Sequence, residues 1–358
     1  MINSHLLQGS MLPGSPSTKG AARVMIAGIG GASLGTEICK CMRLCGGYQV
    51  YGCDVSATAF GLYESGFAGT YLISRQNYVQ NVIEACHTAR ATWLIPGGEE
   101  PMTLLGRASD TLAQAGIRLV GNDPSVVGLC ADKEETFKRL AALGISIPRT
   151  IALSQPADLE YVGLPCIVKP ATGSGGSAGV FYAVTVDEAL IYAEFIRRSG
   201  RVPIAQEYVD VDEGEFTVGV LSLPDGRIAG SIALRRALDA KLSLSYRGRG
   251  GVVSSGYSQG HIGEYPDICR QAEKIASAIG SRGPINVQGR VRDGVLLPFE
   301  INPRFSASTY LRALAGFNEI NMMLNFLIAG KLPTPTTIRS GWYLRSLTET
   351  YVPDAQLK

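Results

Sequence analysis

The sequence predicts an α/β fold made of three packed units, and three stretches of the chain carry that prediction. Residues 23–54 contain an apolar strand, a glycine turn, an amphipathic helix and a second strand, which is the start of a parallel βαβ sheet. Residues 164–184 place a glycine-rich loop between two strands, and residues 284–304 form a hairpin around Asp293-Gly294. A chain of 358 residues is also too long for one simple core.

Composition narrows the class of protein. Hydrophobic residues make up 46% and charged residues 18% of the chain, as expected for a globular protein with a large core. The 33 basic and 31 acidic residues form no long block of one sign, so we expect no nucleic-acid groove and no membrane-surface site. No stretch has the roughly eighteen apolar residues of a membrane span. We therefore expect a cytoplasmic protein with small-molecule partners, either a monomer or a homodimer.

Cysteine and histidine usage excludes two kinds of site. The eight cysteines include no Cys-x-x-Cys pair, and several lie in apolar runs, so buried free thiols are expected, as in a reducing cytosol. Only three histidines are present, at positions 5, 87 and 261. Chemistry built on several histidines is therefore not expected.

The first unit is expected to begin at Arg23. Residues 1–22 are rich in Gly, Ser and Pro without helical periodicity, which predicts a disordered leader or tag. From there to residue 125 we expect a Rossmann-like scaffold. Its turn, GIGGASLG from residue 28 to 35, departs from the dinucleotide fingerprint G-x-G-x-x-G at Ser33, although Asp54 follows at the usual distance. An NAD-dependent oxidoreductase therefore stays open as an alternative.

Two further strands of this unit end in Gly, Pro or acidic residues. They lie in ATWLIPGGEE, residues 91–100, and in IRLVGNDPS, residues 117–125. Ligands of open α/β sheets gather at such strand ends. Pro96, Glu99 and Glu100 are therefore expected either to border a substrate site or to belong to a solvated loop.

The second unit, residues 126–206, opens with a helix and contains the glycine loop. Asp132 is the expected N-cap, Glu135 completes a capping box and Gly144 ends the helix. Lys169 lies on a strand just before the loop, so the pattern is not a Walker A motif. Glycines let backbone N–H groups approach a polyphosphate, and hydroxyl groups add donors; the alternative is a mobile hairpin loop. The candidate phosphate-contacting residues are Thr172, Ser174, Gly175, Gly176 and Ser177.

The third unit, residues 207–350, contains a candidate nucleotide-binding segment and a strand face with candidate metal ligands. Residues 207–214 form an acidic linker whose backbone groups suit adenine, while Glu215 could accept from ribose hydroxyls; a solvated acidic loop is the alternative. Glu300, Asn302 and Arg304 alternate along one strand and share a face.

The register of the hairpin decides whether Gln288 joins that face. A two-residue loop would put Gln288 and Glu300 on opposite faces, whereas a three-residue loop over residues 292–294 would keep them together. Gln288, Glu300 and Asn302 offer only oxygen ligands, which suits Mg²⁺ with nucleotide phosphates as its remaining ligands; Mn²⁺ is an alternative. Arg304 can hold a phosphate or carboxylate oxygen in bidentate fashion.

Five segments, in this order and spacing, resemble the ATP-grasp superfamily. They are GLCADKEETFKRLAALGISIPRT, PCIVKPATGSGGSAGV, QEYVDVDEGEFTVGV, GPINVQ and FEINPRFSAS. The chain is most similar to the carbamoyl-phosphate-synthase large-subunit group, including the amino-acid ligase of pyrrolysine biosynthesis, which also uses Gln, Glu and Asn followed by Pro-Arg. The resemblance covers about residues 23–330. It implies a two-lobed ATP-grasp domain after the Rossmann-like domain, with lobes at 126–206 and 207–350, and residues 351–358 as a tail.

The resemblance also implies roles for individual residues. Lys133 and Lys169 match the two nucleotide lysines, while Glu207, Tyr208 and Val209 match the adenine linker. Glu215 matches an acidic residue near the ribose or phosphates. Gln288, Glu300 and Asn302 match the metal ligands, with Asn302 also at the reacting centre, and Arg304 matches the arginine beside the transferred phosphate.

The implied reaction uses ATP and Mg²⁺ to phosphorylate a carboxylate, and an amine then attacks the acylphosphate to form an amide or peptide bond. Within IALRRALDA, Arg236 is the candidate that meets a substrate carboxylate, unless it is an arginine exposed beside a loop. Carbamoyl phosphate synthesis as such is not expected, because only one synthetase-like copy is present. A bicarbonate or carbamate kinase and a non-catalytic nucleotide-binding module both stay open.

Overall fold

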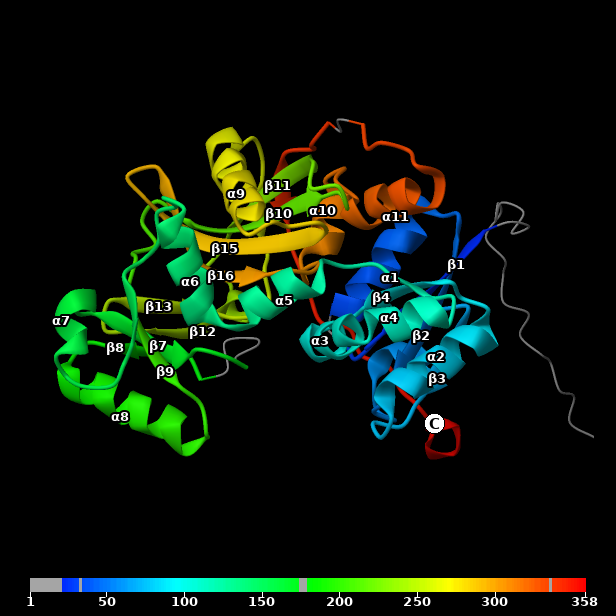
Figure 1. The fold of residues 1–358 in the computed structure, drawn as a ribbon, viewed down its shortest axis with the longest axis horizontal. Coiled ribbons are helices and arrows are strands. Elements are labelled where there is room, and N and C mark those ends of the chain that lie inside the picture. The colour runs from blue at the N-terminus through cyan, green and yellow to red at the C-terminus, as the bar shows by residue number, and fades with distance from the viewer. Residues whose placement is uncertain (1–20, 32–33, 174–178, 335–336) are drawn as a thin grey trace, which may run out of the picture.

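The computed structural model describes residues 21–31, 34–173, 179–334 and 337–358, and it confirms the predicted α/β fold (Figure 1). Residues 1–20, the larger part of the predicted leader, lie outside the described residues. The described chain forms one parallel sheet, two larger antiparallel sheets and a two-stranded ribbon.

The N-terminal sheet is parallel throughout and has the order β3-β2-β1-β4-β5. Its strands are β1 (Ala22–Ala27), β2 (Tyr48–Asp54), β3 (Gly69–Leu72), β4 (Trp93–Pro96) and β5 (Arg118–Leu119). The apolar runs of β1 and β4 are buried because helices cover both faces of the sheet. This arrangement brings the carboxyl ends of β1, β2 and β4 to one edge.

The second sheet is antiparallel, with the order β6-β9-β7-β8. Its strands are β6 (Thr150–Ala152), β7 (Cys166–Pro170), β8 (Phe181–Ala183) and β9 (Pro203–Glu207). One face packs on α8 (Val186–Arg198), whose Ala189, Ala193 and Ile196 are buried. Thr185 caps that helix by accepting from the backbone N–H of Glu188.

The third sheet is also antiparallel and has the order β16-β15-β10-β11-β14-β17. Its strands are β10 (Glu215–Ser222), β11 (Ile228–Arg236), β14 (Gly260–Ile262), β15 (Pro284–Arg292), β16 (Val295–Asn302) and β17 (Gly341–Tyr343). The ribbon pairs β12 (Leu244–Gly248) with β13 (Gly251–Ser254). Figure 1 shows α9 (Pro266–Ala278) lying across this sheet, where its buried face packs on β10, β11 and β16.

The remaining helices surround the sheets. They are α1 (Leu34–Cys45), α2 (Tyr78–Ala89), α3 (Glu99–Arg107), α4 (Ser109–Gln114), α5 (Pro124–Ala131), α6 (Lys133–Ala142), α7 (Asp158–Val162), α10 (Thr309–Leu314) and α11 (Glu319–Ala329). Asp132 caps α6 as predicted, accepting from the N–H groups of Glu134 and Glu135. Gly144, with φ of 72°, follows the end of the helix.

The hairpin between β15 and β16 places Gln288 and Glu300 on one face, but through a loop and a bulge that the sequence did not predict. Its loop has two residues, because Arg292 pairs with Val295 and both Asp293 and Gly294 have positive φ. A β-bulge then shifts the register, so that Gly289 pairs with Pro298 but Gln288 pairs with Glu300. Phe299 is the extra residue, and it returns Gln288 and Glu300 to one face. The predicted three-residue loop is therefore wrong, although the shared face is present.

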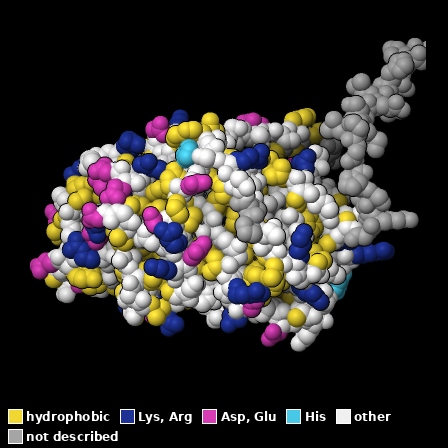
Figure 2. Space-filling model, turned by 90° about the horizontal axis from the view of Figure 1, so that it is seen from above, with side chains coloured by type: hydrophobic (Ala, Val, Ile, Leu, Met, Phe, Trp, Pro, Cys, Tyr) yellow, Lys and Arg dark blue, Asp and Glu magenta, His cyan; other side chains and the backbone are white. Residues whose placement is uncertain are grey.

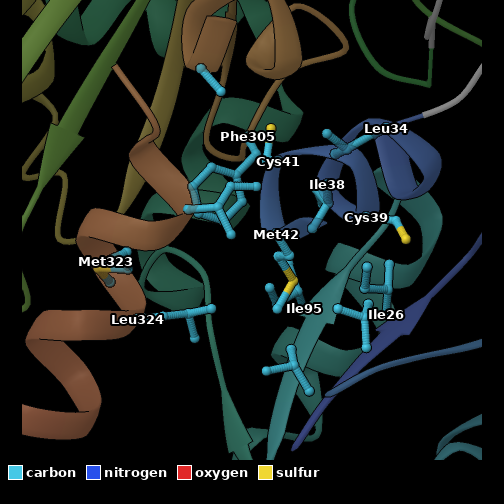
Figure 3. Packing of buried hydrophobic residues seen from close by; sticks show 14 of the residues in the cluster. Ile26, Leu34, Ile38, Cys39, Cys41, Met42, Ile95, Phe305, Met323 and Leu324 are labelled. Carbon is cyan, nitrogen blue, oxygen red and sulfur yellow. The ribbon is translucent and has the colours of Figure 1, made fainter. Parts of the chain in front are cut away.

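One hydrophobic cluster joins the parallel sheet to the third sheet (Figure 3). Ile26 of β1 and Ile95 of β4 face Ile38 and Met42 of α1, and the opposite side of α1 meets Phe305 and the α11 residues Met323 and Leu324. An ion pair from Arg345 to Glu37 lies at the same junction. This packing fixes the N-terminal sheet against β10, β11 and β14 of the third sheet and against Phe305, which follows β16.

The surface carries no large patch of one charge on the face drawn in Figure 2, where Lys and Arg are interspersed with Asp and Glu. The formal net charge of +2 agrees with this pattern. Among the described residues, no helix is long and apolar enough to cross a membrane.

Candidate active site

An apolar cavity of about 80 Å³ lies between the second and third sheets. Its apolar wall comes from both sheets and from the ribbon, and consists of Ile167, Val180, Val209, Val252, Val253, Leu297 and Phe299. Polar groups of Lys133, Lys169, Gln206, Glu207 and Glu300 stand at its edge. An apolar cavity with polar groups at its edge is suited to a planar base and its phosphates.

Lys169 projects from β7 into this cavity and is buried. Its ammonium donates to Gln206 Oε1 and to the Phe299 carbonyl, both at 2.8 Å. Burial lowers the pKa of Lys169 to about 7; the charge of Lys133 lowers it further, and Glu300 opposes the shift. Lys133, the first residue of α6, reaches the same cavity, and its backbone N–H donates to the Ala171 carbonyl at 3.0 Å. The structure thus brings both predicted nucleotide lysines together.

The predicted adenine linker lines the cavity, and the side chains of Glu207 and Tyr208 bind other protein groups. The Glu207 carboxylate contacts Arg149 at 3.2 Å and Arg292 at 2.6 Å. Partial burial would raise the pKa of Glu207, but the hydrogen bonds from Arg292 and Arg149 outweigh it and the pKa is lowered. The hydroxyl of Tyr208 accepts from the Val252 N–H at 2.9 Å. Because these side chains bind protein groups, backbone atoms of the linker are the groups that can meet a base.

Glu215 lies behind the cavity wall and is fully buried. Arg290 Nε donates to Glu215 Oε2 at 2.9 Å, and Arg236 Nη1 lies 3.2 Å from Glu215 Oε1. Burial raises the pKa of Glu215, but the charges of Arg236 and Arg290 outweigh it, so the pKa is lowered. The ion pairs enclose this carboxylate and it lines neither cavity, so the predicted ribose contact stays a prediction.

A polar cavity of about 140 Å³ adjoins the apolar one, and both are bordered by Phe299, Glu300 and Ser254. Gln288 and Glu300 face each other across β15 and β16, with Gln288 Nε2 donating to Glu300 Oε2 at 3.0 Å. Asn302 follows on the same face and also lines the polar cavity. Two serine-rich segments, at residues 254–258 and 306–308, form further walls of the polar cavity together with Thr217, Asn286 and Arg304.

The three oxygen-bearing side chains fit a hard cation that brings its own anionic ligands. They supply one carboxylate and two amide oxygens, and the described residues hold no cluster of three or more His, Cys, Asp or Glu that could bind a metal by itself. Mg²⁺ commonly takes one or two protein carboxylates and completes its shell with phosphates and waters. The donor set is therefore consistent with a metal held jointly with a nucleotide.

Arg304 lines the polar cavity beside Asn302. Its Nη1 donates to the Phe305 carbonyl at 2.9 Å and its Nη2 to Asn302 Oδ1 at 3.5 Å, while its buried Nε has no partner among the described residues. Burial lowers the pKa of Arg304, and Glu300 and Glu99 oppose the shift. A buried guanidinium with an unused donor next to carboxamide and carboxylate oxygens can hold an incoming anion.

Arg236 lies outside both cavities and is almost fully buried. Its Nη2 donates to the carbonyls of Ser255 at 2.8 Å and Tyr257 at 2.9 Å, within the serine loop that lines the polar cavity. This position differs from that of an arginine that meets the substrate. In the structure, Arg236 binds the serine loop without lining the polar cavity.

The glycine loop is described only at its ends. Thr172 and Gly173 follow β7 and are exposed, and the Gly173 carbonyl accepts from Arg201 at 3.1 Å. Ser174, Gly175, Gly176 and Ser177 lie outside the described residues. Their predicted phosphate contacts therefore stay predictions.

Sequence reasoning missed two buried arginines next to the site. Arg290 lies two residues after Gln288 on β15, so the period-2 alternation that paired Glu300 with Asn302 could have placed it on the same face. Arg312 of α10 donates to Asn286 and Thr217, which line the polar cavity, and pairs with Glu319 at 3.2 Å. Nothing in the local sequence of α10 indicates that role, because it depends on tertiary packing.

Comparison with known proteins agrees with this site. A family model described as the ATP-grasp domain matches residues 130–308, which is half of the chain. The carbamoyl phosphate synthase large chain of Mesorhizobium japonicum is 28% identical over 233 residues, covering 59% of this chain and 19% of the relative. The chain thus spans about a fifth of the length of the curated relatives it matches.

Two solved structures share the fold at low identity. A biotin carboxylase from Campylobacter jejuni, in complex with an ATP analogue, has a TM-score of 0.67 at 16% identity, covering 88% of this chain and 73% of that chain. An L-amino acid ligase from Bacillus licheniformis has a TM-score of 0.61 at 16% identity, covering 85% and 73%. Since the ATP-grasp family model covers half of the chain, the chain belongs to the ATP-grasp family.

Proposed function

We propose that the chain is an ATP-dependent carboxylate–amine ligase that forms an amide or peptide bond through an acylphosphate. The observation that carries this proposal is the position of Glu300 on the wall shared by the two cavities. Lys169 lines the apolar cavity on one side of Glu300, and Arg304 lines the polar cavity on the other side. A phosphoryl group bound at Glu300 would therefore lie between a nucleotide and a small anionic acceptor.

In the first step, a carboxylate oxygen of the substrate attacks the γ-phosphorus of ATP and the bond to ADP breaks. Lys169 and Lys133 would neutralise phosphate charge, and Arg304 would orient the attacking carboxylate. Mg²⁺, held by Gln288, Glu300 and Asn302, would neutralise charge on the phosphate oxygens when bound. Catalysis of this kind depends on positioning and charge rather than on a protein nucleophile.

In the second step, the amine nitrogen attacks the acyl carbon, the bond to phosphate breaks, and the amine loses a proton as the amide forms. Phosphate is a far better leaving group than oxide, which is why the first step is needed. The partly buried guanidinium of Arg304 would stabilise the phosphate as it leaves. Serine hydroxyls on the two loops of the polar cavity could bind polar groups of the carboxylate substrate.

The test is an ADP-release screen with single amino acids and pairs of amino acids, followed by mass analysis of the products. A product whose mass equals two substrates less one water, formed together with ADP and phosphate, is the expected result. ATP binding without turnover on any pair would instead indicate a nucleotide-binding module.

A bicarbonate or carbamate kinase is the second candidate. It is favoured by the matches to carbamoyl phosphate synthase large chains and by the modest volume of the polar cavity, about 140 Å³. ADP release that requires bicarbonate and no added amine other than ammonia would identify it. Requirement for an organic carboxylate would exclude it.

A further inference from the structure

One cavity of the described residues lies in the N-terminal unit and has no role in the reaction so far. It measures about 250 Å³ and opens at the carboxyl ends of β1, β2 and β4. β1 is central, with β2 on one side and β4 on the other, so chain connections leave the sheet in opposite directions here. Open α/β sheets bind ligands at this kind of position. We call it the strand-end cleft.

Glycines open the cleft by letting three backbone segments approach one another. A side chain at Gly97 would meet the Gly28 carbonyl oxygen at 2.0 Å, so this contact admits only glycine. At Gly30, which lines the cleft, an added Cβ would have no atom of the described residues within 4 Å. Among the described residues, the space beside Gly30 is therefore open.

The groups that line the cleft are of both charges. Asp54, at the end of β2, accepts from the backbone N–H groups of Ile29 at 2.7 Å and Ser56 at 3.0 Å, and pairs with no cation among the described residues. At the mouth, Arg75 pairs with Glu100 at 2.5 Å, so these two charges offset each other. The lining side chains thus carry one negative charge in excess, at Asp54.

Two neutral donors complete the lining. Tyr78 lines the cleft, and its hydroxyl can donate to a ligand there. Burial raises the pKa of Tyr78, so this hydroxyl keeps its proton. The N–H groups of Glu99 and Glu100 lie beside the cleft at the start of α3, where Gly98 caps the helix without a side-chain hydrogen bond.

We infer that the strand-end cleft binds the amine-bearing co-substrate of the proposed ligase, a compact α-amino acid. Its ammonium group would contact Asp54, and its carboxylate would accept from the start of α3, from Arg75 and from Tyr78. This inference rests on the proposed function and adds the class and location of the second substrate.

The start of α3 connects the cleft to the reacting centre. Glu100 borders the cleft, while its neighbour Glu99 borders a small cavity lined by Lys133, Glu300 and Asn302. The charge of Glu99 also acts on Arg304. A ligand in the cleft is thus separated from the phosphate site by the first residues of one helix.

The binding test uses calorimetry without ATP, with L-alanine, L-lysine and L-glutamate as probes. The excess negative charge predicts that L-alanine and L-lysine bind at least tenfold more tightly than L-glutamate. Gly30→Val fills the open space and should lower the affinity for both at least tenfold. Gly128→Val is the matched control, because Gly128 is exposed on α5 and its added side chain also meets no described atom.

A charge variant keeps the test decisive if Gly30→Val does not fold. Glu100→Gln releases Arg75 at the mouth and removes one negative charge, so the preference for L-lysine over L-glutamate should fall at least fivefold. Glu84→Gln, on the exposed face of α2, is its control. An unchanged preference in Glu100→Gln, with unchanged affinity in a folded Gly30→Val, would overturn the inference.

Kinetics separate this inference from the proposed function. In the ligase assay, Gly30→Val should raise the KM of the amine substrate at least tenfold and leave the KM of ATP unchanged. Ligation with an unaltered amine KM would reject the cleft while the ligase stands. Tight binding of NADH that Gly30→Val abolishes, without amino-acid binding, would show instead that the cleft is a dinucleotide site.

Discussion

Arg290 stands between Glu215 and the adenine linker, and it holds both. Its Nε donates to Glu215 Oε2 at 2.9 Å, its Nη1 to the Val209 carbonyl at 2.8 Å and its Nη2 to the Val252 carbonyl at 2.6 Å. The guanidinium carbon also lies 4.9 Å from the centre of the Tyr208 ring. One side chain therefore joins three walls of the apolar cavity, and Glu215 fixes that side chain in place.

Replacing Arg290 with lysine should disrupt these walls while keeping the charge. Lysine cannot span the three acceptors, so we expect the Kd of ATP to rise at least tenfold and the free energy of unfolding to fall by roughly 2–4 kcal/mol. Isothermal calorimetry and urea unfolding measure the two effects. Arg227→Lys, in the exposed turn where Arg227 pairs with Asp225, should change neither. Normal ATP affinity in Arg290→Lys would show that the linker keeps its shape without it.

Lys169 should make nucleotide binding depend on pH. In the ligand-free protein burial lowers its pKa to about 7, with Lys133 adding to the shift, and phosphates would raise that pKa again. Binding should then take up close to one proton at about pH 8, and affinity should fall by up to about tenfold per pH unit above pH 7. Calorimetry in buffers of different ionisation enthalpy measures the uptake.

The variant Lys169→Met keeps the apolar stem and removes the titrating group, so the proton uptake should vanish and the affinity for ATP should fall. Without nucleotide, the same lowered pKa makes stability rise with pH between about 7 and 10.5, because the unfolded chain holds a proton that the folded state has released. Proton uptake that persists in Lys169→Met would assign the titration to another group.

Glu300→Gln should remove the one carboxylate of the candidate metal set. Turnover should fall about a hundredfold, which corresponds to roughly 3 kcal/mol of barrier, and the gain in ATP affinity on adding Mg²⁺ should be lost. The change is nearly isosteric, so the melting temperature should stay close to that of the parent. Glu264→Gln, at an exposed position, is the control. Unchanged turnover with a retained Mg²⁺ effect would remove Glu300 from the metal site.

The hairpin that carries Glu300 shows which features of the site could be predicted from the sequence and which could not. Alternation along β16 correctly put Glu300, Asn302 and Arg304 together, because side chains of a strand repeat every two residues. The relation to Gln288 depended on the bulge at Phe299, and no local signal distinguishes a two-residue loop with a bulge from a longer loop. The bulge also turns the Phe299 carbonyl to Lys169, a contact between residues 130 positions apart.

The sequence alone could not predict which charged residues are buried. Glu215 and Arg236 lie in strands whose neighbours give no sign that the two side chains meet each other rather than a ligand. The N-cap at Asp132 was predictable because capping is decided within four residues of chain. Contacts between segments far apart in the sequence, such as that of Arg290 with the ribbon, require the tertiary fold.

Arg236 and Arg304 should respond differently to the same substitution. Arg236 lies outside both cavities and contacts Glu215 and two loop carbonyls, so Arg236→Lys should lower the melting temperature, speed amide exchange over residues 254–258 and raise the KM of the carboxylate substrate. Arg304 faces the polar cavity with an unpartnered Nε, so Arg304→Lys should lower kcat at least tenfold with little change in stability or exchange. Differential scanning fluorimetry, hydrogen exchange and steady-state kinetics on both variants make the comparison. If Arg236→Lys instead lowers kcat while stability and loop exchange stay normal, Arg236 contacts the substrate directly, as the sequence alone predicted.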